Sequence, residues 1–198
     1  AVTLSVWLLS SSPDSIREGD MPVDAFPPTL EALSFYDCVV LGDVPPGTLY
    51  PEDFENLRRY VEDLGGGLVV IAGERLAPDG TALPASPGAY KGTALEPLLP
   101  VLLSGIPRPW GSADGEGTEP FRMERTPEAA RLAPFRLGPD AETSARVWRA
   151  LPGPFRIAPE TDLAPLAVPL VVARPPAGPD GAIVTASMRR AGIGKVLY

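Results

Sequence analysis

The stretch YVEDLGGGLVVIAGER, residues 60–75, constrains the fold more than any other part of the sequence. It leads from the end of an amphipathic segment through three glycines into a short apolar run. A second apolar run, Cys38–Leu41, lies upstream and is closed by Gly42 and Asp43. Because two apolar runs joined by an amphipathic segment are typical of a right-handed βαβ unit, the pattern predicts a parallel sheet.

A helix is predicted over residues 51–64, between two strands. Pro51 suits the first helical position, and acidic residues follow in the first turn, where the helix dipole favours anions. Gly65 ends the helix, because glycine readily adopts the left-handed conformation. We expect strands over residues 37–42 and 67–72, the first of them buried on both faces. One helix face is apolar; it consists of Phe54, Leu57, Val61 and Leu64.

Further strands are predicted near both ends of the sequence. Residues 2–9 alternate apolar and other side chains, which is a strand pattern. The segments LAVPLVVARP, GAIVTASMRR and GKVLY also read as strands, and Pro179-Asp180-Gly181 marks a turn between the first two. This region should therefore be an antiparallel edge of the same sheet. TPEAARLAPFRL and AETSARVWRALPG should form short helices, joined by long loops rich in proline and glycine.

One α/β domain over residues 1–198 is the expected organisation, with a core at 1–103 and a region of loops and edge strands at 104–198. A hydrophobic content of 44% is enough to fill one core. The sequence begins without methionine and both ends fall in predicted strands, so we expect a piece of a longer protein. An open edge at residues 2–9 could then pair with another copy, unless the segment 10–28 covers it.

Charge and composition exclude several classes of function. A net charge of −8 with no basic cluster argues against nucleic-acid binding. No apolar run approaches the roughly 20 residues of a membrane helix, so this segment should not insert into a membrane. The chain has no histidine and one cysteine, which excludes Ser-His-Asp and Cys-His arrangements within it. We expect no metal and no cofactor.

Three motifs between Phe26 and Val101 resemble class I glutamine amidotransferase-like domains, in the non-enzymatic branch related to ThuA-like proteins of large bacterial membrane-associated proteins. The motifs are FPPTLEALSFYDCVVLGDVPPG, NLRRYVEDLGGGLVVIAGER and AYKGTALEPLLPV, and the later VWRALPG and GIGKVLY resemble the closing segment of that family. The resemblance implies a flavodoxin-like parallel sheet flanked by helices. It also implies a soluble domain within a membrane-associated envelope protein, because relatives continue beyond both ends of this sequence.

The same resemblance implies that the catalytic position is degenerate. Active relatives place a cysteine at the elbow after the strand that matches Leu68–Ile71, and complete a triad with histidine and glutamate. The match puts Ala72, or at the latest Gly73, at the nucleophile position, and neither can attack an amide carbon. Cys38 falls inside the preceding strand, where we expect a buried core thiol. Glutaminase activity is therefore not expected.

Charged residues follow both predicted strands, at the edge where open α/β sheets bind ligands. Asp43, Glu74 and Arg75 could form a polar pocket there. Alternatively, Asp43 caps a turn at Pro45-Pro46, and Glu74 and Arg75 pair with each other or with backbone. The run Gly65–Gly67 precedes a strand, unlike a phosphate loop, which follows one. The acidic residues of the later glycine-rich loop read as a solvated segment; they are Asp114, Glu116 and Glu119.

Two function classes remain. The first is a non-catalytic binding or scaffold module that uses the carboxyl edge of the sheet to contact a protein partner or other domains of the same chain. The second is a hydrolase-type enzyme of unrecognised class, in which Asp43, Glu74 and Arg75 act as acid, base and anion clamp. An enzyme requires a concave site with a carboxylate of perturbed pKa, whereas a scaffold does not.

Overall fold

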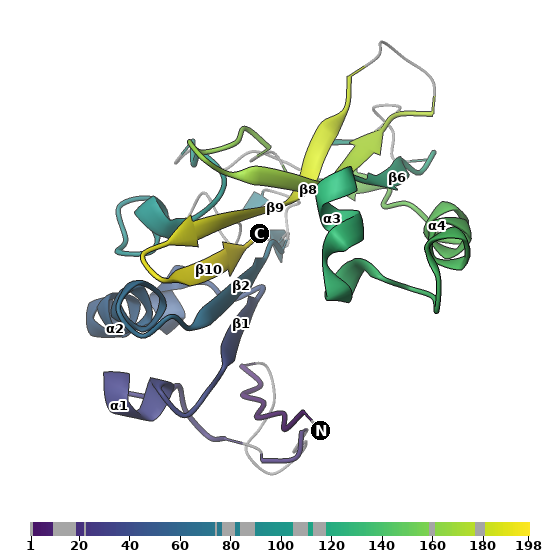
Figure 1. Cartoon of the computed structure of the whole chain (residues 1–198). Coiled ribbons are helices and arrows are strands. Elements are labelled where there is room, and N and C mark those ends of the chain that lie inside the picture. Colours follow the sequence, from purple (N-terminus) through teal and green to yellow (C-terminus); the bar gives the residue numbers. More distant parts are fainter. Residues whose placement is uncertain are drawn as a thin grey trace.

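The computed structural model describes residues 2–9, 19–21, 23–73, 75–76, 82–83, 90–104, 111–112, 118–158, 161–176 and 181–198 (Figure 1). A six-stranded sheet has the order β1-β2-β10-β9-β8-β6. Its strands are β1 (Cys38–Gly42), β2 (Gly67–Ile71), β6 (Arg122–Arg125), β8 (Val168–Arg174), β9 (Ile183–Ala191) and β10 (Gly194–Leu197). The first three strands in this order are parallel, and the pairs β10–β9, β9–β8 and β8–β6 are antiparallel. The fold is therefore α/β with a mixed sheet.

Shorter elements surround this sheet. The helices are α1 (Leu30–Leu33), α2 (Pro51–Glu62), α3 (Pro127–Arg131) and α4 (Ala141–Ala150), with 3-10 turns at Pro46–Thr48, Glu96–Leu98 and Ala133–Phe135. Two small two-stranded antiparallel sheets pair β3 (Arg75–Leu76) with β4 (Ala82–Leu83) and β5 (Gly111–Ser112) with β7 (Arg156–Ile157). In the part of the chain that is described, no helix is long and apolar enough to cross a bilayer.

The predicted βαβ unit is confirmed. β1 and β2 pair in parallel, with Val40 opposite Val69, and α2 connects them. The start of α2 is fixed by Asp53, whose carboxylate accepts a hydrogen bond of 2.9 Å from the backbone N–H of Tyr50. The helix ends at Glu62, two residues before the predicted end, and Leu64 is 48% exposed and does not belong to the buried face.

The three glycines after α2 allow three pieces of backbone to meet closely. Gly65 has a φ of 79°, as expected for a helix stop, and the N–H of Gly66 donates to the carbonyl of Tyr60 at 3.0 Å. A Cβ at Gly194 would lie 2.3 Å from the carbonyl oxygen of Val61 and 2.6 Å from that of Gly66. The glycines therefore serve the contact between the end of α2, the start of β2 and the turn before β10.

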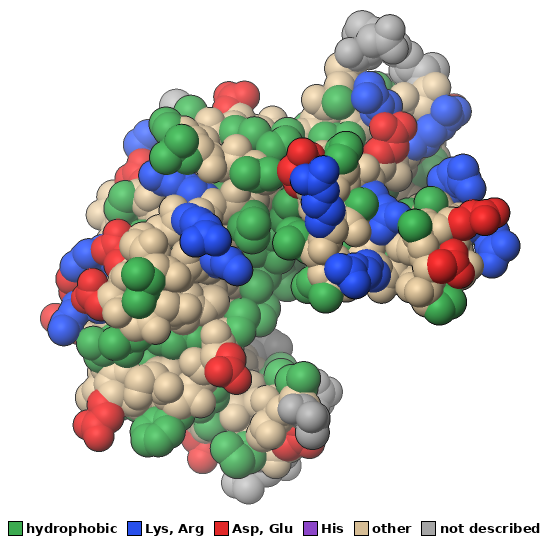
Figure 2. All heavy atoms as spheres, viewed as in Figure 1, with side chains coloured by type: hydrophobic (Ala, Val, Ile, Leu, Met, Phe, Trp, Pro, Cys, Tyr) green, Lys and Arg blue, Asp and Glu red, His purple; other side chains and the backbone are tan. Residues whose placement is uncertain are grey.

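The two halves of the sheet are covered on opposite faces. Val196 belongs to the cluster around α2, whereas its neighbour Leu197 packs with the cluster around α3 and α4. Because consecutive strand residues point to opposite faces, these two clusters lie on opposite sides of the sheet. Over the parallel strands the helices of the described residues consequently leave one face open. Figure 2 shows hydrophobic side chains gathered in a hollow over the region where Figure 1 draws β10, β2 and β1.

The expectation that the strand at 37–42 is buried on both faces was wrong. Its residues alternate, with Leu41 buried against α2, while Cys38 and Val40 are exposed on the open face. The side chain of Val40 is 56% exposed and that of Ile71 on β2 is 55% exposed. A continuous apolar run was thus misread, because periodicity does not reveal which face of a strand lacks a covering helix.

The predicted strand at residues 2–9 was also wrong. This extended segment makes one isolated bridge, between Ser5 and Gly19, and does not join the sheet, so β1 is the edge strand. Its backbone pairs instead with the segment that follows: the N–H groups of Asp20 and Val23 donate to Leu4 and Val6 at 2.7 and 3.2 Å. Alternation fits an extended chain as well as a strand, and only the partner decides between them.

The strands predicted near the end of the sequence are confirmed as β8, β9 and β10, and α4 matches the second predicted helix. β10 differs from the expected edge position, because it lies inside the sheet, parallel to β2 and antiparallel to β9. β6, with the sequence RMER, was not predicted as a strand, since it has no apolar run. The turn predicted at residues 179–181 lies largely outside the described residues.

Candidate functional site

A cavity of about 450 Å³ lies at the carboxyl ends of β2 and β10. β10 ends with Leu197, which pairs with Val69 on β2 and with Met188 on β9. β2 continues beyond this point to Ile71, and the corresponding part of β9 lies on the other side. Consecutive residues of both strands line the cavity, so it is a slot in the plane of the sheet rather than a hollow over one face.

The walls of the slot are mostly apolar. Lining residues come from β2 and its end, from the paired part of β9, from the end of β10 and from the segment around β7; they are Val69, Val70, Ile71, Ala72, Met123, Pro154, Arg156, Ile157, Ala158, Thr161, Val184, Thr185, Ala186, Leu197 and Tyr198. Among these described residues Arg156 carries the only charge, and it is half-buried. The slot is therefore suited to apolar groups.

Ala72, the position that the resemblance assigns to a nucleophile, lines the slot directly after β2. Gly73 follows, and the carboxylate of Asp43 fills the space beside it: a Cβ at Gly73 would lie 1.8 Å from Asp43 Oδ1. A methyl group and a hydrogen atom occupy these two positions, and neither offers a lone pair for attack on a carbonyl carbon. Proton transfer there would depend on other groups.

Asp43 connects the ends of the two parallel strands. Its φ is 49°, its N–H donates to the carbonyl of Ile71 at 3.2 Å, and its side chain contacts Gly73. Nearby, the hydroxyl of Tyr90 donates to the carbonyl of Val44 at 2.6 Å. Burial of Tyr90 raises the pKa of its phenol, and the charge of Asp43 raises it further. Asp43 thus contributes to the packing of this junction.

The proposed trio of Asp43, Glu74 and Arg75 is described only in part. Glu74 lies outside the described residues, and Arg75 is described as a backbone position that begins the β3–β4 hairpin. Of the acidic loop, Glu119 is exposed, whereas Asp114 and Glu116 lie outside the described residues. Within the described ranges, no cluster of three or more Cys, Asp or Glu side chains could hold a metal ion.

Cys38 is exposed on the open face of β1, which corrects the expected core position. Its Sγ lies 3.8 Å from the carbonyl oxygen of Val39. Partial burial raises the pKa of the thiol, and the charge of Asp37 raises it further. A raised pKa keeps the sulfur protonated near neutral pH, which is the reverse of what a nucleophilic cysteine needs.

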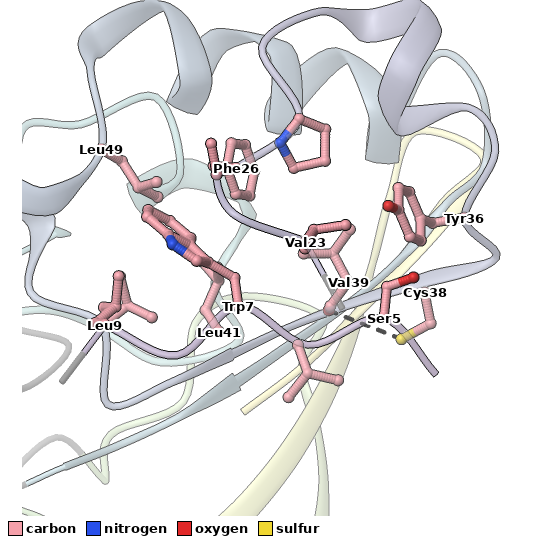
Figure 3. Close-up of a pocket in the computed structure, with 14 residues that line it drawn as sticks. Ser5, Trp7, Leu9, Val23, Phe26, Tyr36, Cys38, Val39, Leu41 and Leu49 are labelled. Carbon is pink, nitrogen blue, oxygen red and sulfur yellow. Dashed lines mark hydrogen bonds between the residues drawn. The ribbon is translucent and has the colours of Figure 1, made fainter. Parts of the chain in front are cut away.

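A second, smaller cavity of about 130 Å³ lies along the free edge of β1 (Figure 3). Four consecutive residues, Cys38–Leu41, form one side, and the extended segment 2–9 contributes Ser5, Trp7 and Leu9. In Figure 3 Trp7 lies near Phe26, and their ring centroids are 6.4 Å apart. The cavity separates an extended segment from a strand edge.

The sequence did not predict this slot or its walls. Ala72, which the resemblance places at a degenerate nucleophile position, is one of the lining residues, whereas Asp43 is not among them. Thr185, Arg156 and Tyr198 were missed, because the register of β10 between β2 and β9 brings them together from distant segments. The segment GKVLY was correctly predicted as a strand and could have pointed to these residues, but its position between β2 and β9 was not predicted.

Comparison with known proteins shows the fold alone. No protein-family model and no curated protein matches this sequence. Among solved structures, the chain is similar to cytoplasmic protein STM3548 from Salmonella typhimurium, with a TM-score of 0.62 and 21% identity. The match covers 89% of this chain and 66% of that protein, so this chain spans somewhat less than two thirds of its length.

Proposed function

We propose that this chain is a non-catalytic, amidotransferase-like module of flavodoxin-like architecture, which binds a partner at the carboxyl edge of its parallel strands. The module belongs to a membrane-associated envelope protein, and its partner is another protein or another domain of the same chain. The observation that carries the proposal is Ala72, whose methyl group lines an apolar slot where an enzyme of this type places its nucleophile.

Three further observations support binding rather than catalysis. The sequence has no histidine to serve as a base near neutral pH. The side chain of Asp43 packs against Gly73 at the junction of two strands. The thiol of Cys38 lies on the open face of β1 and does not line the slot. The hydrolase alternative gains no support from Asp43, the member of its trio whose side chain is described.

Two measurements on the purified chain test the proposal. Ammonia release from glutamine should not exceed a buffer blank, and a rate that Cys38→Ser abolishes would show that the nucleophile was misplaced. Binding of the apolar anion 8-anilinonaphthalene-1-sulfonate should be saturable and should weaken in Ala72→Phe, which fills the slot. The matched control Ala145→Phe changes a half-buried residue of α4 that does not line the slot.

A further inference from the structure

The outer edge of β1 presents backbone donors and acceptors to the smaller cavity. On the other edge, the N–H of Gly67 donates to the carbonyl of Asp37 at 3.0 Å, and the N–H of Asp43 donates to the end of β2 at 3.2 Å. Residues that bond to one neighbour alternate along a strand with residues whose backbone groups point the other way. The N–H and C=O groups of Cys38 and Val40 therefore point away from β2, toward the outer edge.

The smaller cavity touches these groups directly. Cys38 and Val40 are both among its lining residues, and within the described ranges β1 pairs with β2 alone. In order along the strand, the edge offers the carbonyl of Cys38, the N–H of Val40 and the carbonyl of Val40. A ligand in the cavity can thus form the hydrogen bonds that an added strand would form.

The remaining walls of this cavity are apolar and are held by the core. The rings of Trp7 and Phe26 pack against the buried cluster around α2, which includes Leu41 and Leu49. Figure 3 shows the indole of Trp7 directed toward Leu49. No Asp, Glu, Lys or Arg is among the described residues that line the cavity. The walls therefore favour a neutral, flat group with apolar faces.

The volume of the cavity limits the size of that group. A volume of about 130 Å³ is close to the roughly 150 Å³ of an engineered apolar cavity that binds benzene in another protein, so one six-membered ring fits. A ring that shields the backbone of β1 from water must bond to it, because an unsatisfied buried polar group weakens a complex. The ring must consequently carry a donor beside an acceptor, as a cyclic amide does.

We propose that the cavity beside β1 binds a neutral six-membered cyclic amide of the 2-pyridone type. The N–H of the ring donates to the carbonyl of Cys38, its carbonyl accepts from the N–H of Val40, and its faces contact Trp7 and Phe26. The site is separate from the slot of the proposed function, because the two cavities share no lining residue. The inference therefore goes beyond that function and is tested independently of it.

The first test is a nuclear magnetic resonance titration of the ¹⁵N-labelled whole chain with 2-pyridone. We expect saturable shifts centred on the N–H of Val40, with a dissociation constant on the order of 1 mM for a ligand of this size. N-methyl-2-pyridone lacks the donor, and benzene lacks both polar groups. Each should bind at least about fivefold more weakly, which corresponds to the loss of one hydrogen bond. Equal affinity for the three ligands would overturn the proposal.

Variants of Val40 locate the hydrogen bonds. Val40→Pro removes the N–H, and proline is tolerated on an edge strand where the N–H faces outward. Val40→Ala is the matched control, because it keeps the N–H and shortens a side chain that is 56% exposed. Val40→Pro should weaken 2-pyridone binding at least about fivefold, whereas Val40→Ala should change it less than about twofold. If Val40→Pro fails to fold, the comparison of the three ligands on the unaltered chain still decides the matter.

Hydrogen exchange tests whether the edge of β1 is available. The N–H of Val40 should exchange rapidly in the ligand-free chain, and about tenfold more slowly with 2-pyridone at about ten times its dissociation constant. Slow exchange in the ligand-free chain would show that the edge is already paired. Shifts confined to residues of the slot, such as Ala72 and Thr185, would assign the ligand to the other cavity. Either result would overturn the proposal.

Discussion

Gly66→Ala tests how closely the helix end and the sheet are packed. An added Cβ would lie 2.1, 2.3 and 2.4 Å from Cζ, Cε1 and Cε2 of the Tyr60 ring. The ring cannot move aside easily, because Tyr60 is 1% exposed and its hydroxyl donates to the carbonyl of Tyr36 at 2.9 Å. The substitution must therefore displace either a buried ring or the start of β2.

The expected cost follows from two effects. Overpacking of this kind destabilises proteins by about 1–3 kcal/mol. If the ring rotates away, loss of the hydrogen bond to Tyr36 adds about 1 kcal/mol, while the reduced entropy of the unfolded chain offsets about 0.4–1 kcal/mol. We expect the free energy of unfolding to fall by about 2–3 kcal/mol, which is a large part of a typical domain stability of about 5–15 kcal/mol.

Urea unfolding followed by circular dichroism measures this change as a shift of the midpoint at constant slope. Gly42→Ala is the matched control, because no atom of the described residues lies within 4 Å of a Cβ built there, and we expect no loss of stability. In a Tyr60→Leu background the cost of Gly66→Ala should fall below about 1 kcal/mol. A loss below about 0.5 kcal/mol in the unaltered background, or an unchanged loss beside Leu, would refute the reasoning.

Three further predictions concern individual side chains. Burial, aided by the charges of Cys38 and Asp37, raises the pKa of the Tyr60 phenol to about 12. The neutral phenol therefore contributes its full share of the folding free energy below about pH 10, where tyrosine titrates in the unfolded chain. This contribution is lost as the pH rises through about 12. Tyr60→Phe should therefore lower the free energy of unfolding by about 1 kcal/mol at pH 7, and this variant should lose less stability at alkaline pH. If urea unfolding gives the same decrease of stability with pH for the variant and the unaltered chain, the prediction is wrong. Cys38 should react with Ellman's reagent in the folded protein, because it is exposed. The reaction at pH 8 should be slower than that of free cysteine, because the pKa of the thiol is raised. Labelling only after unfolding would show instead that Cys38 lies in the core. Ser187→Ala should leave stability equal or higher by about 1 kcal/mol, because its fully buried hydroxyl has no hydrogen-bond partner among the described residues. A clear loss of stability in thermal unfolding would reveal such a partner.

Local patterns predicted the elements whose neighbours are close in sequence. The apolar spacing of α2 and the run that forms β2 lie within one βαβ unit, so periodicity alone was sufficient. The failures concern distant partners. Whether residues 2–9 join the sheet depends on the edge of β1, and the exposure of Cys38 depends on what covers that face. The slot depends on the register of Leu197 between Val69 and Met188, which no local pattern encodes.

The place of β10 in the sheet sets an order of events in folding. β10 is formed by residues 194–197, yet it lies between β2 and β9 and joins the parallel strands to the antiparallel ones. During synthesis, β2 therefore leaves the ribosome more than a hundred residues before its neighbour, with one edge unpaired. Contacts of such sequence separation slow folding and leave exposed strand edges open to aggregation. A chaperone that shields β2 until residues 194–198 are complete should consequently raise the yield of folded protein.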